Sequence, residues 1–256
     1  PVTDDMVLTI TAPPTADAGS DETVCEGSSF DLSTSATVPT ATNASSLVWS
    51  TSGDGGFDDA TALTPIYTPG AADITAGTVT LTLQANGNGS CPSVTDDMVL
   101  TVEPAPTADA GSDEEICAGD DLDLSASTVL PTATNASSLL WTTSGDGSFD
   151  DDTAITPIYT PGAADVTAGT VTLTLQATGN APCTPVTDDM VLTITAPPTA
   201  NAGSDETVCE GSSFDLSTSV TAPTATNASS LLWTTSGDGG FDDATALTPI
   251  YTPGAA

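Results

Sequence analysis

The sequence repeats itself with a period of 92 residues, and this repeat limits the folds that are open to it. The tryptophans keep the spacing: Trp49, Trp141 and Trp233. Three of the cysteines keep it too: Cys25, Cys117 and Cys209. Residues 13–72 and 197–256 differ at only five of 60 positions. A unit of this size is too long for a solenoid repeat and matches a self-contained β-sandwich of about 100 residues. The period therefore predicts a row of similar domains.

The ends of the units are marked by proline-containing joins at residues 12–15, 103–106 and 196–199. Residues 1–12 repeat the last strand of a unit, residues 13–104 and 105–196 are complete units, and residues 197–256 form an incomplete one. We interpret the sequence as part of a longer array. Short proline-rich joins are stiffer than Gly/Ser tethers, so we expect an extended filament of beads on a string.

Within one unit, the residue pattern is that of an all-β fold. Residues 78–83 alternate strictly, which places Val79, Leu81 and Leu83 on one face and threonines on the other. Residues 98–102 alternate in the same way. Gly- and Pro-rich turns separate the predicted strands, and no segment shows an apolar helical period. Several short strands around a single tryptophan predict an Ig-like sandwich.

The charge is extreme and excludes several functions. The chain has no Lys, Arg or His against 35 Asp and Glu, so its formal net charge is −35. Binding to nucleic acid or to anionic lipid needs cationic side chains, and histidine-based catalysis needs an imidazole. No apolar run approaches the roughly 20 residues that span a bilayer, so we expect no direct membrane insertion. Paired carboxylates in Gly-rich turns are a weak basis for catalysis, and we expect no enzyme.

The cysteines suggest an oxidising compartment. Each complete unit holds two, and we expect them to pair within the unit, as Cys25–Cys91 and Cys117–Cys183. Closing a loop of that length would stabilise a unit by roughly 4 kcal/mol in the chain-entropy model. Free thiols and bridges between neighbouring chains are the alternatives. Cys209 has no partner of this kind in the sequence.

Carboxylates gather near the Gly-rich turns and the domain joins, where oxygen ligands suit Ca²⁺. The candidate ligands in the first unit are Asp17, Asp21, Asp54, Asp58 and Asp59. Their counterparts in the second unit are Asp109, Asp113 and Asp146. Calcium is the one cofactor that these residues suggest, and a solvated acidic face without any ligand is the alternative.

Three asparagines stand in Asn-Ala-Ser triplets, the pattern of an N-glycosylation acceptor: Asn43, Asn135 and Asn227. Such triplets also arise by chance in a chain rich in Ser and Thr.

Residues 16–27, Ala-Asp-Ala-Gly-Ser-Asp-Glu-Thr-Val-Cys-Glu-Gly, followed by Trp49 and the turn Gly53-Asp54-Gly55, carry a family resemblance. The chain resembles the PKD-like and Ig-like repeats of very large Bacteroidota cell-surface adhesins, including gliding-motility adhesins. Calcium-binding PKD domains commonly have an Asp-rich loop before the tryptophan strand, whereas residues 42–46 here contain no carboxylate. The resemblance therefore places calcium on Asp17, Asp21 and Asp54.

These observations predict a structural and adhesive role. The chain would be the stalk of a secreted cell-surface adhesin, a thread that holds an adhesive tip away from the cell. One alternative is a self-assembling extracellular fibre or sheath whose repeats pack laterally. Another is a carbohydrate-binding array on a secreted hydrolase. Expected partners are other copies of the chain, or an external surface or polysaccharide bound through regions outside these residues.

Overall fold

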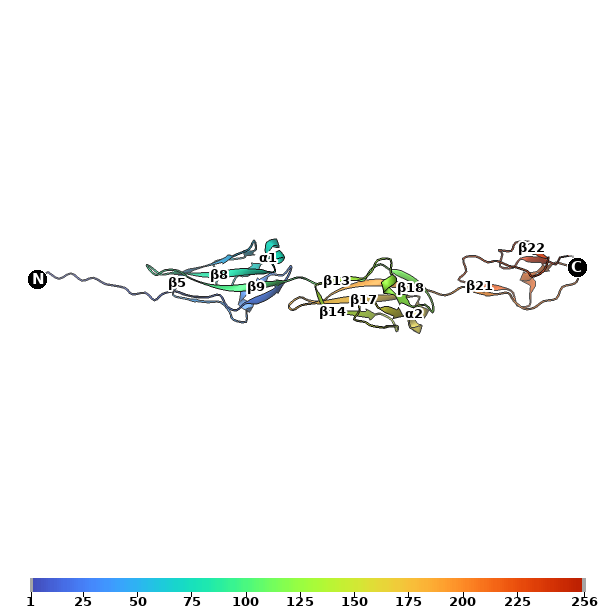
Figure 1. Cartoon of the computed structure of the whole chain (residues 1–256), viewed down its shortest axis with the longest axis horizontal. Coiled ribbons are helices and arrows are strands. Elements are labelled where there is room, and N and C mark those ends of the chain that lie inside the picture. The colour runs from blue at the N-terminus through green and yellow to red at the C-terminus, as the bar shows by residue number, and fades with distance from the viewer. Residues whose placement is uncertain (1, 255–256) are drawn as a thin grey trace.

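The computed structural model describes residues 2–254, and in it the repeats follow one another along a single line (Figure 1). Two complete β domains are followed by a third, smaller one, and an extended segment precedes the first. Among the described residues, no helix has the length and apolar character needed to cross a membrane. The all-β tandem architecture expected from the sequence is confirmed.

The first repeat is a sandwich of short and long strands. Its strands are β1 (Thr15–Asp17), β2 (Glu22–Cys25), β3 (Phe30–Asp31), β4 (Thr40–Thr42), β5 (Ala44–Thr51), β6 (Gly56–Phe57), β7 (Ile66–Thr68), β8 (Thr78–Gly87) and β9 (Val94–Glu103). A four-stranded sheet has the order β2-β9-β8-β5, and a three-stranded sheet has the order β3-β7-β6. Strands β1 and β4 form a separate pair. A 3₁₀ turn (Leu32–Thr34) lies between β3 and β4, and the short helix α1 (Ala71–Ala76) lies between β7 and β8.

The direction of β2 decides where Cys25 lies. Strand β2 runs parallel to β9, with Glu22 opposite Leu100 and Cys25 opposite Glu103, whereas β8 pairs antiparallel with both β9 and β5. Because β9 ends at the join to the next repeat, β2 also ends there. Cys25 is therefore at the far end of the first repeat.

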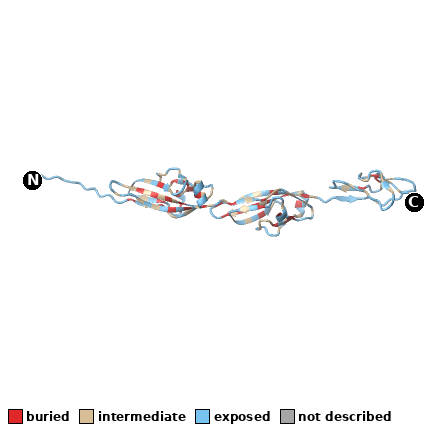
Figure 2. Ribbon diagram, turned by 45° about the horizontal axis from the view of Figure 1, so that its top comes forward, coloured by how far each residue is buried: buried red, intermediate tan, exposed pale blue. Residues whose placement is uncertain are grey.

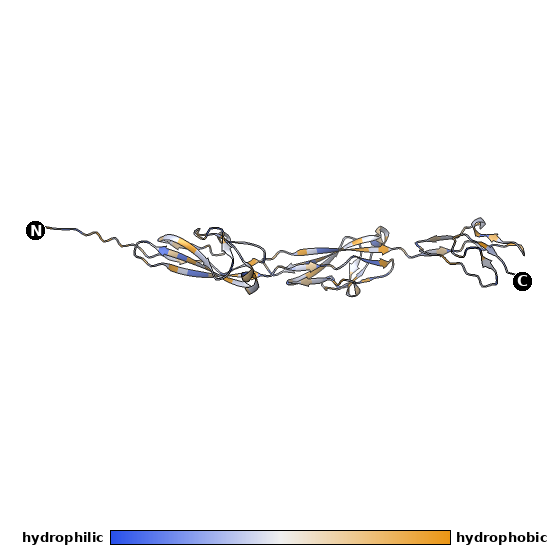
Figure 3. Cartoon of the chain, turned by 90° about the horizontal axis from the view of Figure 1, so that it is seen from above, coloured by the Kyte–Doolittle hydropathy of each residue, from blue (hydrophilic) through white to orange (hydrophobic). Residues whose placement is uncertain are grey.

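The core follows from the two-residue period of the strands. Val79, Leu81 and Leu83 on β8 are buried together with Met98 and Leu100 on β9. Figure 2 shows these buried positions as alternating red bands along the long strands, and Figure 3 shows the matching alternation of hydropathy. An aromatic chain closes the other side of the core: Trp49 packs on Phe57 and Phe57 on Tyr67, with ring centroids 5.8 and 4.9 Å apart.

The second repeat reproduces the first. Its strands are β10 (Thr107–Asp109), β11 (Glu114–Cys117), β12 (Leu122–Asp123), β13 (Thr132–Thr134), β14 (Ala136–Thr143), β15 (Ser148–Phe149), β16 (Ile158–Thr160), β17 (Thr170–Gly179) and β18 (Val186–Thr195). Its 3₁₀ turn is Leu124–Ala126 and its helix is α2 (Ala163–Ala168). The four-stranded sheet again has the parallel pair, β11 with β18. Equal sequences thus form equal sheets.

The third repeat is only half formed. Its strands are β19 (Thr199–Asn201), β20 (Phe214–Asp215), β21 (Thr224–Thr226), β22 (Gly240–Phe241) and β23 (Ile250–Thr252), with a 3₁₀ turn at Leu216–Thr218. The three-stranded sheet β20-β23-β22 is present. Residues 206–209 and 228–235, the counterparts of β2 and β5, form no strand. In the complete repeats β2 pairs with β9 and β5 pairs with β8. Residues 197–256 contain no counterpart of β8 or β9, so these two segments have no strand to pair with.

Residues 2–12, ahead of the first repeat, also lack a strand to pair with. They share the sequence pattern of β9 and β18 but form no strand. Met6 and Ile10 are 87% and 88% exposed, whereas their counterparts in the complete repeats are core residues. An alternating pattern alone is not enough to form a strand, because the strand needs a neighbouring edge to pair with.

We expect Leu100→Ala to destabilise the first repeat by about 3 kcal/mol, because it leaves a cavity between β9 and the opposite sheet. In a calorimetric scan, the transition of the first repeat should fall by on the order of 15 °C, away from that of the second. Val99→Ala, on the exposed side of the same strand, should change stability by less than about 1 kcal/mol. Equal effects of the two substitutions would contradict the assigned faces.

Candidate functional site at the repeat junction

The junction between the first two repeats is closed by a disulfide bond between Cys25 and Cys183. The two Cα atoms are 5.0 Å apart, although 158 positions separate the residues in the sequence. Cys25 ends β2 at the far end of the first repeat, and Cys183 precedes β18 at the near end of the second. The bridge therefore joins neighbouring repeats.

The predicted pairs Cys25–Cys91 and Cys117–Cys183 are wrong, since Cys91 and Cys117 are free. The reason is the length of β9. Cys25 lies opposite Glu103 at the end of this strand, while Cys91 lies just before its first residue, Val94. A ten-residue strand spans roughly 33 Å, and a disulfide requires Cα atoms within about 7 Å. The spacing of the cysteines along the chain contains no sign that the two lie at opposite ends of a repeat.

The free cysteines occupy the same two positions at other junctions. Cys91 Sγ lies 3.2 Å from Thr11 Oγ1, beside the segment that leads into the first repeat. Cys183 Sγ likewise lies 3.7 Å from the carbonyl oxygen of Glu103, the counterpart of Thr11. Cys117 stands opposite Thr195 as Cys25 stands opposite Glu103, at the end of the second repeat.

Hydrogen bonds from both repeats hold the join at residues 103–106. From the first repeat, Glu26 donates its backbone N–H to the Glu103 carbonyl (2.8 Å), and its carboxylate accepts the N–H of Ala105 (3.2 Å). From the second, Asn135 Nδ2 donates to the Ala105 carbonyl (3.0 Å). The join is thus tied to the domains on both sides of it. The next junction lacks the carboxylate, because Ala118 stands where Glu26 would be.

The three asparagines of the Asn-Ala-Ser triplets have a structural part in every join. Each adopts a left-handed backbone conformation, with φ of 54–55°, which asparagine tolerates better than most residues. Each side chain donates to a carbonyl of the join that precedes its own repeat: Asn43 to Pro13, Asn135 to Ala105 and Asn227 to Pro197. The triplet pattern gave no hint of this contact. Glycosylation at these positions stays a prediction.

The carboxylates proposed for calcium do not converge. In residues 2–254, no group of three or more Asp, Glu, His or Cys is arranged to hold a metal ion. Instead these side chains accept hydrogen bonds from the backbone. Asp17 and Asp109 bind the turn N–H of Gly19 and Gly111. Asp21 and Asp113 bind the N–H of Val99 and Val191 on the long strand. Asp58 accepts from Ile66, and Asp59 from Thr61. Among the described residues these carboxylates are thus occupied by backbone N–H groups, and calcium binding at them stays a prediction.

Asp54 instead takes part in a reciprocal contact with Asp73, which the sequence reasoning missed. Asp54 Oδ1 accepts the N–H of Ala72 and Asp73 at the start of α1 (3.0 and 3.4 Å). The carboxylate of Asp73 in turn accepts the N–H groups of Asp54 and Gly55 (3.3 and 3.1 Å). Asp146 and Asp165 repeat the arrangement in the second repeat. The glycines of the Gly53-Asp54-Gly55 turn are required, because the Asp73 carboxylate and the Tyr67 hydroxyl fill the space of a Cβ.

Asp73 is buried and still ionised. Burial disfavours its charge, but hydrogen bonds from Tyr67 (2.6 Å), Gly70, Asp54 and Gly55 outweigh burial, so the pKa of Asp73 lies below its ordinary value. Burial and the neighbouring Asp73 raise the pKa of Tyr67 to about 12. Asp165 and Tyr159 behave in the same way. A carboxylate held this way is a structural anchor between turn and helix.

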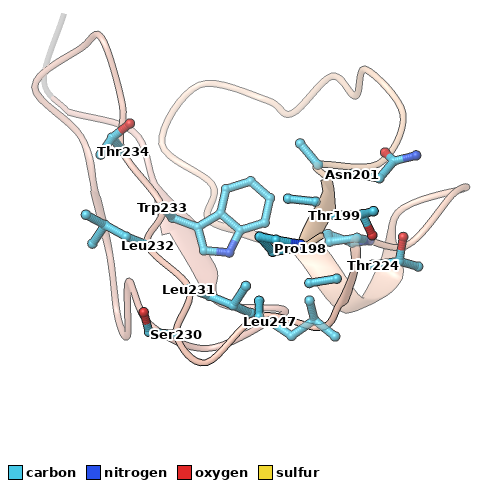
Figure 4. Close-up of a pocket in the computed structure, with 15 residues that line it drawn as sticks. Pro198, Thr199, Asn201, Thr224, Ser230, Leu231, Leu232, Trp233, Thr234 and Leu247 are labelled. Atoms are coloured by element: carbon cyan, nitrogen blue, oxygen red, sulfur yellow. The ribbon is translucent and has the colours of Figure 1, made fainter. Parts of the chain in front are cut away.

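A cavity in the third repeat is the open core of that repeat. It measures about 550 Å³ and is lined by Trp233, Leu231, Leu247 and Pro198 among others. Figure 4 shows the Trp233 ring facing this space. Trp49 and Trp141, its counterparts, are buried on β5 and β14, which pair with β8 and β17. The cavity is therefore lined by the counterpart of β5, which has no strand to pair with in the third repeat.

We expect peptide mapping of the oxidised chain without reductant to yield one cross-linked species, which joins the peptides of Cys25 and Cys183. Alkylation before unfolding should label Cys117 and Cys209, which are exposed, and alkylation after unfolding should add Cys91. Recovery of Cys25 linked to Cys91 would contradict this connectivity.

We expect Asp73→Asn to destabilise the first repeat by roughly 2–4 kcal/mol, because an amide leaves buried N–H donors without an acceptor. The folded-state pKa is lowered, so the contribution is complete above the unfolded value of 3.8 and disappears as the pH falls below it. Urea unfolding should therefore show a difference between wild type and variant that shrinks below about pH 4. Asp97→Asn, an equal change of charge at an exposed position, is the control and should show no such loss.

Comparison with known proteins finds similarity to other rows of β domains. No protein-family model and no curated protein matches the chain. A three-Ig structure of titin domains I67–I69 is 14% identical with a TM-score of 0.49, and the match covers 96% of this chain and 90% of that one. Human CDH23 EC21-23 is 15% identical with a TM-score of 0.41, at 96% and 91% coverage. Sidekick-1 immunoglobulin domains 1–5 are 13% identical with a TM-score of 0.40, at 75% and 41% coverage.

Proposed function

We propose that the chain is a structural repeat region of a secreted cell-surface adhesin, a stalk that holds an adhesive part away from the cell. The observation that carries this proposal is the junction. A disulfide joins one repeat to the next, and hydrogen bonds from both sides tie the join between them. A chain whose domains are fixed end to end extends in one direction (Figure 1), and extension is what a stalk provides.

The disulfide also supports an extracellular location. Disulfides persist in oxidising surroundings and are rare where glutathione keeps thiols reduced. The resemblance of residues 16–27 to Bacteroidota adhesin repeats agrees with such a location and supplies the adhesin part of the proposal.

The surface charge favours a single thread over the lateral fibre. With a formal charge of −35 and no cationic side chain, the sides of two identical chains repel each other. No pair of Asp or Glu with Lys or Arg is available to offset that repulsion. Lateral packing would thus need added cations, whereas end-to-end contact is already made within the chain.

Electron microscopy of the full chain at low ionic strength tests the proposal. We expect single rods one chain wide, with the same appearance in EDTA. Antibodies against the chain should label intact source cells, and protease treatment of those cells should remove the label. Bundles of parallel chains would favour the fibre instead, and labelling only after lysis would contradict a surface location.

A further inference from the structure

The Cys25–Cys183 bridge creates a second covalent route between the ends of the chain. Along the backbone, tension between the first and second repeats passes through every residue of both. Through the bridge, tension passes from Cys25 directly to Cys183. It bypasses the residues between these two cysteines, which are 158 positions apart in the sequence. The bridge bears the load only if the shorter route is already close to its full extended length in the folded chain.

In the first repeat the shorter route is already straight. It enters at residue 13 and runs to Cys25 alongside β9, in the same direction. The Ala18 N–H donates to Asp96, the Val99 N–H donates to Asp21, and Cys25 lies opposite Glu103. Each of these three pairs has the same sequence offset of 78 positions. Residues 18–25 therefore advance step for step with an extended strand.

In the second repeat the shorter route is a strand itself. From Cys183 the chain enters β18, which runs from the near end of the repeat to the next join at residue 196. The route thus uses residues 13–25 and 183–196, both of which cross a repeat from end to end. An extended residue spans about 3.4 Å, so these two segments together reach about 90 Å when fully stretched. The same two repeats without a bridge would stretch to about 630 Å.

We propose that the Cys25–Cys183 bridge is a mechanical clip, which carries tension from one repeat to the next and keeps residues 26–182 out of the line of force. The main sheets of both repeats lie in the shielded part, apart from β2 and β18. Pulling on the chain therefore cannot lengthen the pair of repeats by unravelling them. The clip works in a single stalk and in a laterally packed fibre alike, so its test does not depend on the proposed function.

Single-molecule force extension of the full 256-residue chain, held at its two termini, tests the clip. We expect the fully stretched oxidised chain to be shorter than the reduced chain by about 540 Å, the length of 158 extended residues. Cys25→Ser and Cys183→Ser should each restore the full length without reductant. Cys117→Ser, which removes a free cysteine, is the matched control and should stretch like oxidised wild type.

Other results would overturn the clip. Equal lengths of the oxidised and reduced chains would show that no bridge bears the load. Two bridges within the repeats would shorten the chain by two separate steps of about 220 Å each, one for every 66 residues. In that case Cys117→Ser would release one step, and Cys25→Ser would release only the other.

Discussion

The parallel pairing of β2 with β9 is the constraint on which the rest of the structure depends. It takes the chain from one end of a repeat to the other within about a dozen residues of the join. After β2 the chain forms the remaining strands of the repeat, and β9 then crosses the repeat in the same direction as β2. Two strands therefore end at the same junction, one early and one late in the repeat. The Cys25 sulfur of the disulfide, the Glu26 carboxylate and the join itself meet there for that reason.

Much of the fold could be predicted from the sequence because it depends on local patterning. The alternation of Val79, Leu81 and Leu83 identifies β8 and its buried face, and the repeated tryptophans identify the core. The threonines between them mark the less buried face of the same strand. These features can be predicted from the sequence because each depends only on a residue and its near neighbours along the chain.

The contacts at the junction could not be predicted, because each joins residues far apart in sequence. The pairing of Cys25 depends on which end of the sheet β2 reaches, and the strand pattern contains no information on direction. Asp54 looks like a ligand in a Gly-rich turn, yet its partner is the start of α1, 18 positions away. The repeated Tyr67 and Asp73 were a usable signal. An acidic residue that recurs at the period of the core tryptophan is a candidate for a buried anchor.

The bridge between repeats also changes what a single break in the backbone would do. A protease that cut once anywhere between Cys25 and Cys183 would sever the polypeptide but leave its two ends joined through the disulfide. The exposed turns of both repeats, including the Gly-rich turns at residues 53–56 and 145–148, lie within that span. The proposed surface thread would meet proteases in its surroundings, and in this architecture one nick would not shorten it. Continuity would be lost by a cut outside the span, or by reduction of the bridge after a cut within it.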